Sequence, residues 1–276
     1  MDTVASGEFA GLWQILLMYG AAGCVAGVLA GLFGVGGGVI VVPALTFVFT
    51  MQNMNQEVIM HMALGTSLAA IIMTSSSSVR AHHKRGAVKW PLVGRITPGI
   101  IIGVLLGSVL AAHLSSQFLK IFFACYLLLV AVQMFLNAKP KATRQLPGTL
   151  GVFGVGNIIG IVSSLVGIGG GTLSVPFMVW CNVKVHKAIA TSAAIGMPIA
   201  IFGAIGYIIN GWGDPNLPPY SLGYVQWPAL LGVACVSVLT APLGAKIAYL
   251  MPTAVLKKVF AIFLLLMAVR MFWSAF

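Results

Sequence analysis

Charged side chains are scarce in this chain, and acidic ones are nearly absent. Of its 276 residues only 7% are charged, with four Asp or Glu against 15 Lys or Arg, whereas soluble domains carry about 25% charged residues. No polar stretch is long enough to form a soluble domain, and many apolar runs reach the ~20 residues that span a bilayer. The sequence therefore predicts an all-α, polytopic integral membrane protein.

No Asp or Glu lies inside an apolar run. Pumps that relay protons through the membrane use buried carboxylates, so proton coupling of that kind is not expected here. An anion that leaves a cell with a negative interior needs no coupling, because the membrane potential supplies about 2.3 kcal/mol per charge per 100 mV. This absence favours export of an anion over its concentrative uptake.

Signatures of enzymes and of metal or redox sites are also missing. The chain holds no HExxH, no GxSxG and no P-loop that ends in Lys-Ser/Thr. The cysteines stand alone in apolar surroundings, without CxxC or Cys/His spacing; they are Cys24, Cys125, Cys181 and Cys235. We therefore expect no enzymatic activity, no cofactor and no bound metal.

The basic residues give the chain a formal net charge of +11. In a soluble protein this excess would suggest a nucleic-acid partner, but here the basic residues lie in short loops such as Arg80–Lys89 and Lys139–Pro147. Basic residues gather in the cytoplasmic loops of membrane proteins. We therefore expect no nucleic acid, and instead a multi-pass protein of the cell inner (plasma) membrane with its N-terminus outside.

Two glycine clusters interrupt the apolar runs, GVGGGVIVVP at Gly34–Pro43 and GIGGGTLSVP at Gly167–Pro176. Each glycine disfavours a helix interior by roughly 1 kcal/mol. Non-helical backbone is tolerated inside a bilayer only where it is buried in protein or lines a polar cavity. Paired breaks in two halves of a membrane chain indicate a transport site, and close helix packing through small residues is the alternative.

Four landmarks recur in the same order, which indicates an internal duplication. Besides the glycine clusters, three pairs match: HMALGTS at His61 with HKAIATS at His186, Trp90-Pro91 with Trp227-Pro228, and LLLVAVQMF at Leu127 with LLLMAVRMF at Leu264. Each half holds about five apolar segments, one of them short or broken.

The charges of matching loops differ between the halves. Arg80–Lys89 is basic, whereas its counterpart Gly211–Gln226 has no Lys or Arg. The loop Met51–Met60 also has no Lys or Arg, and it matches one with Lys184 and Lys187. Matching loops then lie on opposite sides of the membrane, which predicts two inverted repeats. We expect a first transmembrane repeat at 1–138, a cytoplasmic linker at 139–148 and a second repeat at 149–276; whether the short segments cross or re-enter stays open.

The doubled glycine cluster, the A-x-x-T-S run after each, and the H-x-K-R-G-x-V-x-W loop at His82–Trp90 resemble the TauE/SafE sulfite-exporter (TSUP) family of permeases over nearly the whole chain. This resemblance implies a transporter of sulfur-containing anions such as sulfite, sulfonates, sulfoacetate or thiosulfate. A related thiosulfate-uptake branch uses cysteines along its path, and the lack of paired cysteines here weakens that assignment.

Inverted broken helices would bring two helix N-termini, at Val39 and Thr172, to the middle of the membrane. Free N–H groups and the positive helix end favour an anion, and consecutive glycine N–H groups form a nest for an oxyanion. Hydroxyls roughly five residues inside the following helices, about 7 Å from the end, could join them, or could bond back to their own helix; Ser163 and Ser164 are similar candidates. The candidate substrate-binding residues are Gly34, Gly36, Gly37, Gly38, Val39, Thr66, Ser67, Gly167, Gly169, Gly170, Gly171, Thr172, Thr191 and Ser192.

These observations predict a membrane transporter that exports a small sulfur-containing anion, namely sulfite, sulfoacetate or a related organosulfonate. The alternatives are an importer of sulfate or thiosulfate, and a membrane scaffold subunit that transports nothing. The expected partners are the anion and the lipid bilayer, and a homo-oligomer stays open.

Overall fold

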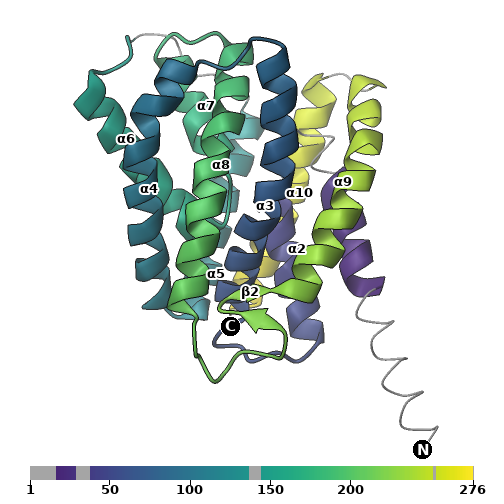
Figure 1. Cartoon of the computed structure of the whole chain (residues 1–276). Helices are drawn as coiled ribbons and strands as arrows, with labels where there is room; N and C mark the ends of the chain where they lie inside the picture. The colour runs from purple at the N-terminus through teal and green to yellow at the C-terminus, as the bar shows by residue number, and fades with distance from the viewer. Residues whose placement is uncertain (1–16, 29–37, 137–143, 251–252, 276) are drawn as a thin grey trace, which may run out of the picture.

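Helices that lie roughly side by side make up nearly all of the described chain (Figure 1). The computed structural model describes residues 17–28, 38–136, 144–250 and 253–275, and five helices among them are long and apolar enough to cross a membrane. This confirms the predicted all-α, polytopic membrane protein. The elements are a first helix described over Leu17–Val28, then α2 (Gly38–Met51), α3 (Ile59–Lys84), α4 (Trp90–Ala112), α5 (Ser116–Phe135), α6 (Thr149–Val166), α7 (Gly171–Trp180), α8 (Val185–Asn210), β1 (Ser221–Leu222), β2 (Val225–Gln226), α9 (Trp227–Leu250) and α10 (Thr253–Trp273).

The structure differs from the sequence-based expectation in three details. The helix α3 extends to Lys84, so part of the predicted basic loop is helical; the chain leaves it at Gly86, whose φ of 62° suits glycine. The long loop after α8 contains the antiparallel pair β1–β2, which the sequence did not predict. The helix α7 begins at Gly171, one residue earlier than expected, and α2 is described from Gly38 onward.

The two ends of the molecule differ in charge. At one end, called here the basic end, α3 joins α4 through the Arg80–Lys89 segment; at the other, the hairpin end, lie β1 and β2 (Figure 1). The helices α3 and α8 run in opposite directions between these ends. A Cβ on Gly65, near the start of α3, would lie 3.0 Å from Cβ of Tyr207 near the end of α8, and the Lys89 N–H after α3 donates to Thr191 Oγ1 near the start of α8 (3.0 Å).

The two short helices turn back instead of crossing. After α6 the chain reverses at Gly167–Gly170, and the ten residues of α7 extend about 15 Å, half of a bilayer core. The carbonyl of Trp180 at the end of α7 accepts a hydrogen bond from the Arg144 N–H in the linker (3.3 Å), so α7 returns to the basic end. The helix α2 returns instead to the hairpin end (Figure 1).

Glycines bring α4 and α6 into backbone contact. A Cβ on Gly156 would lie 2.6 Å from the Ile96 carbonyl oxygen, and one on Gly160 would lie 2.6 Å from the Ile100 carbonyl oxygen. A Cβ on Gly103 would collide with the carbonyl oxygen of Asn157. Close approach of helix backbones through small residues is a common way to stabilise helix pairs in membranes.

We expect Gly103→Ala to lower the thermal stability of the purified protein, because the added methyl group must displace the Asn157 backbone. Overpacking of this kind costs about 1–3 kcal/mol. Gly94→Ala is the matched control, since it lies on the same helix and a Cβ there meets nothing within 4 Å. A thermal melt followed by size-exclusion chromatography compares them, and equal melting temperatures would contradict the packing described.

The pattern of contacts between helices is symmetric with respect to the two halves of the chain. The first helix packs on α9, where a Cβ on Gly23 would lie 2.9 Å from the Val233 carbonyl oxygen, just as α6 packs on α4. The helix pairs α3–α8 and α5–α10 each join equivalent segments, and α4 lies on α8 as α9 lies on α3. Every one of these contacts maps onto itself or onto another when the halves are swapped.

Candidate functional site

The second glycine break is built on left-handed backbone. Gly167 ends α6 with φ of 67°, and Gly170 precedes α7 with φ of 71°; this region of φ strains residues that carry a Cβ. The N–H groups of Gly167 and Ile168 donate to the carbonyls of Ser164 (3.3 Å) and Ser163 (3.1 Å), which closes the end of α6. Two of the four glycines are therefore required by the turn itself.

The start of α7 presents free backbone donors. The Gly170 carbonyl accepts the N–H groups of Leu173 (3.1 Å) and Ser174 (2.8 Å). The N–H groups from Gly169 through Thr172 donate no hydrogen bond to any other described residue. Unsatisfied N–H groups at a helix start, together with the helix dipole, form an anion-binding site where a ligand can reach them.

The beginning of α2 meets this second break. A Cβ on Gly38 would lie 2.7 Å from the Gly167 carbonyl oxygen and 3.1 Å from Cα of Ile168. Val39 follows with 1% exposure. The remaining first-cluster candidates, Gly34, Gly36 and Gly37, lie outside the described residues. The structure thus brings the short helix of one half against the break of the other half.

Hydroxyl groups surround the break from several helices. Ser67 of α3 donates to the Gly167 carbonyl (2.9 Å). Ser192 of α8 shares a hydrogen bond with Ser174 of α7 (2.7 Å) and lies 3.6 Å from the Cβ position of Gly171. Thr172 shares a hydrogen bond with the phenol of Tyr126 from α5. Three of the five predicted hydroxyl residues, Ser67, Thr172 and Ser192, therefore contact the break or its helix.

Ser163 supplies a buried hydroxyl with no partner. Its side chain is 1% exposed, and its Oγ makes no hydrogen bond within the described structure. This oxygen lies 3.4 Å from the position of a Cβ on Gly170, so it faces the turn that precedes the free N–H groups. Buried polar groups are usually satisfied, and an unsatisfied one is often found where a ligand or ion binds.

The comparison with known proteins agrees with this architecture. The sequence model of one protein family, described as "Sulfite exporter TauE/SafE", matches residues 19–271. The chain belongs to the TauE/SafE family. Three similar relatives are each named a probable membrane transporter protein: one of Haemophilus influenzae (38% identical, 95% of this chain and 99% of the relative), one of Methanocaldococcus jannaschii (31%, 87% and 88%) and YunE of Bacillus subtilis (27%, 91% and 95%). No solved structure matches.

In each Thr-Ser pair of this TauE/SafE chain, the threonine and the serine make hydrogen bonds to different parts of the structure. Thr66 Oγ1 accepts the N–H of Gln226 (3.1 Å), and Thr191 Oγ1 accepts the N–H of Lys89 (3.0 Å). In each case the donor directly precedes the Trp-Pro that begins a helix of the other half. Thr191 also donates to the Lys187 carbonyl of its own helix (2.6 Å). The described contacts of both threonines are with helix starts and not with a break.

Two residues at the break of this TauE/SafE chain were missed by the sequence analysis. Tyr126 lies in an apolar run of α5, where an aromatic ring is ordinarily a packing residue, and Ser174 lies within α7. A polar atom in a helix that faces hydrocarbon is costly unless it makes a hydrogen bond. An isolated hydroxyl in an apolar run therefore indicates a hydrogen-bond partner elsewhere in the chain, and this pattern could have identified both residues. The described residues that line the break are neutral, and its hydrogen-bond donors are hydroxyl and backbone N–H groups.

The hairpin end of the TauE/SafE chain is closed by aromatic and amide side chains. Tyr224 packs on His61 with ring centroids 5.0 Å apart and ring planes tilted by 31°, and it donates to an Asp214 carboxylate oxygen (3.1 Å). Burial raises the pKa of Tyr224 to about 12, so this phenol stays protonated at neutral pH. Tyr19, fully buried, donates to Gln226 Oε1 (2.7 Å).

The basic end is more open along α3. All residues from Ile59 to Ile71 are buried, whereas Thr74 to Ser78 are half-buried or exposed. Ser75 lies beside the break, since a Cβ on Gly196 would be 3.5 Å from Ser75 Oγ and 2.8 Å from the Gly169 carbonyl oxygen. The Thr74 and Ser76 hydroxyls donate to the Ile71 and Ile72 carbonyls of their own helix (3.2 Å and 2.6 Å), a common arrangement for hydroxyls in membrane helices.

Proposed function

We propose that this TauE/SafE chain exports a small sulfur-containing anion, such as sulfite, sulfoacetate or a related organosulfonate, across the cell inner membrane. The binding site would lie at the second break, where α2 begins. The contact between Gly38 and the Gly167 carbonyl carries the proposal, because it joins the two glycine clusters at one place. A transporter also agrees with the names of the relatives, and it fits a protein without enzymatic activity.

The chemistry of the site suits an oxyanion of low charge. Backbone N–H groups from Gly169 to Thr172 and the unpartnered hydroxyl of Ser163 are all donors that a sulfonate or sulfite oxygen could accept. A sulfonate offers three such oxygens. Because the described lining has no cation, the bound anion would keep its charge during transfer, and the transport would carry current.

We further propose that residues 1–138 and 149–276 are inverted repeats joined by a cytoplasmic linker at 139–148. The opposite directions of α3 and α8, and the contacts that map onto each other when the halves are exchanged, support this arrangement. The basic end then lies in the cytoplasm. A path along Ser75 to Ser78 of α3, called here the serine path, would admit the anion from the cytoplasm, and the closed hairpin end would open for its release.

Flux from proteoliposomes tests the function. Vesicles loaded with the labelled anions sulfite or sulfoacetate, or with the zwitterion taurine, are expected to lose one of these compounds, or several, only when the protein is present. An inside-negative potential should speed the loss of an anion, since each charge gains about 2.3 kcal/mol per 100 mV. Loss at the same rate at zero and at negative potential would contradict an electrogenic export, and no flux of any of them would contradict the proposed substrates.

A further inference from the structure

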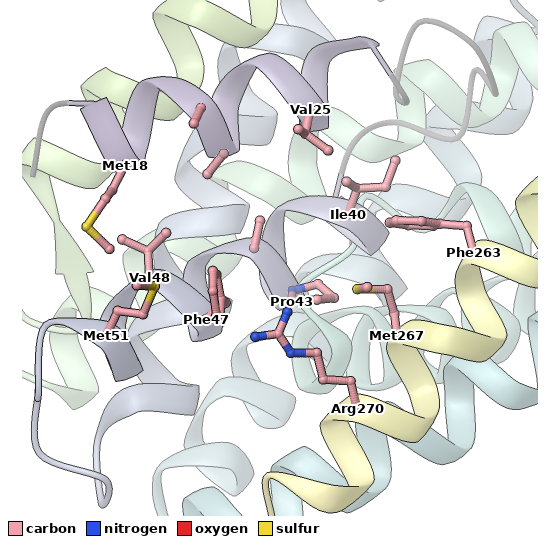
Figure 2. A pocket seen from close by; sticks show the side chains of 13 residues that line it. Met18, Val25, Ile40, Pro43, Phe47, Val48, Met51, Phe263, Met267 and Arg270 are labelled. Atoms are coloured by element: carbon pink, nitrogen blue, oxygen red, sulfur yellow. The ribbon is translucent and has the colours of Figure 1, made fainter. Parts of the chain in front are cut away.

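A groove of about 330 Å³ lies between the first helix, α2 and α10, apart from the glycine break (Figure 2). Its walls are apolar side chains, among them Met18, Ile40, Phe47 and Phe263, and Arg270 is the one charged residue among the described residues that line it. A groove of one cation and many apolar groups matches a ligand that has a charged head and a hydrocarbon tail.

The groove runs along the membrane normal with its cation near the surface. Met51 ends α2 at the hairpin end, and Arg270 lies in the last turn of α10. Ile40 and Phe263 form the deeper part, beside the start of α2 (Figure 2). The seven steps along the helix from Phe263 to Arg270 correspond to about 10 Å of helix rise. The apolar part thus reaches from headgroup depth toward the centre of the bilayer.

The mouth of the groove opens to the side of the molecule. Val25 is 53% exposed, Phe47 42% and Met51 56%. In a chain that spans the membrane, apolar side chains exposed at this depth face lipid tails. A lipid can therefore enter the groove directly from the bilayer.

Arg270 is available to an anion. Its guanidinium carbon lies 3.9 Å from the centroid of the Phe47 ring (Figure 2), and within the described part of the chain no carboxylate pairs with it. The described acids are engaged elsewhere, Glu57 with Asn216 (3.5 Å) and Asp214 with Tyr224 (3.1 Å). A guanidinium has five N–H donors, and its fork geometry matches the oxygens of a phosphate.

We propose that this groove is a binding site for one anionic phospholipid, with its phosphate on Arg270 and an acyl chain along α2. An arginine in a pocket between membrane helices can hold a phosphate through charge-assisted hydrogen bonds. The bound chain would cover the side of α2 from Phe47 to Ile40, next to the start of that short helix. The proposal concerns lipid binding alone and does not depend on the identity of the transported anion.

Native mass spectrometry of the full chain tests this site. The protein is equilibrated in a mild detergent with equal amounts of dioleoyl phosphatidylglycerol and dioleoyl phosphatidylcholine. We expect one phosphatidylglycerol to be retained per chain, at least tenfold less in Arg270→Gln, and nearly the full amount in Arg270→Lys. Ala44→Phe, which fills the groove and keeps the arginine, should lower retention as much as Arg270→Gln.

Two variants serve as matched controls. Arg95→Gln removes an exposed arginine of α4, and Val132→Phe adds bulk on the 48% exposed, lipid-facing side of α5; both should retain the lipid as the unchanged protein does. Equal retention of the two lipids, or unchanged retention in Arg270→Gln, would overturn the proposal. A dimer that Ala44→Phe dissociates would also overturn it, because a second copy of the chain would then occupy the groove.

Discussion

Anion flux is expected to fall at least a hundredfold when Gly170 is replaced by leucine, while the protein still inserts and folds. The native φ of 71° strains any residue with a Cβ, and that Cβ would lie 2.5 Å from Ile199 Cδ1 and 3.4 Å from Ser163 Oγ. The leucine side chain would therefore occupy the space in front of the free N–H groups. Efflux from proteoliposomes measures the loss.

Gly154→Leu is the control for this substitution. It lies on α6, where a Cβ meets nothing within 4 Å, and it should transport normally. A second variant, Ser163→Ala, leaves the turn intact and removes only the unpartnered hydroxyl; we expect its KM to rise about tenfold, which corresponds to about 1.4 kcal/mol. Normal flux in Gly170→Leu together with an unchanged KM in Ser163→Ala would remove the second break from the site.

Cysteine labelling should show that the loop between α3 and α4 and the loop between α8 and α9 lie on opposite faces of the membrane. One loop should react nearly completely in intact cells, and the other should not react. In a background without the four native cysteines, Pro215→Cys at the hairpin end should react with an impermeant maleimide on intact cells. Arg85→Cys at the basic end should react only after the membrane is permeabilised. Both positions are exposed, so access to water alone would not separate them.

This experiment addresses the inverted arrangement independently of transport. If the chain crossed the membrane an even number of times between Arg85 and Pro215, both cysteines would lie on the same face. Reaction of both in intact cells, or of neither, would therefore contradict an inverted pair of repeats. Reaction of Arg85→Cys alone would keep the inversion and reverse the orientation, and would then argue against the serine path as the cytoplasmic entrance.

Much of the helix order was predictable because repeated, short-range signals determine it. The second glycine cluster marked the break between α6 and α7, since glycine disfavours a helix wherever it occurs. The repeated Trp-Pro pairs lie at the starts of α4 and α9, where proline is well tolerated. The reversal of the short segments was not predictable, because a 14-residue apolar helix such as α2 can either continue across a bilayer or turn back within it.

The candidate site was predictable only in part. Neighbouring residues on a helix point about 100° apart, so Thr66 and Ser67 reach different partners, and the sequence could not tell which of them faces the break. Ser67 does, through the Gly167 carbonyl, and Thr66 does not. The hydrogen bond of Tyr126 to Thr172 joins segments from different halves, and no local pattern encodes such a contact.

The paired threonine bonds have a consequence for biosynthesis. The bond from Gln226 to Thr66 joins residues 160 positions apart, so Thr66 leaves the ribosome long before its partner is made. A nascent first half therefore inserts with an incomplete helix interface, and we expect the insertion machinery or a membrane chaperone to hold it until α9 arrives. A chain truncated at the linker should accordingly be removed by membrane proteolysis, however hydrophobic its helices are.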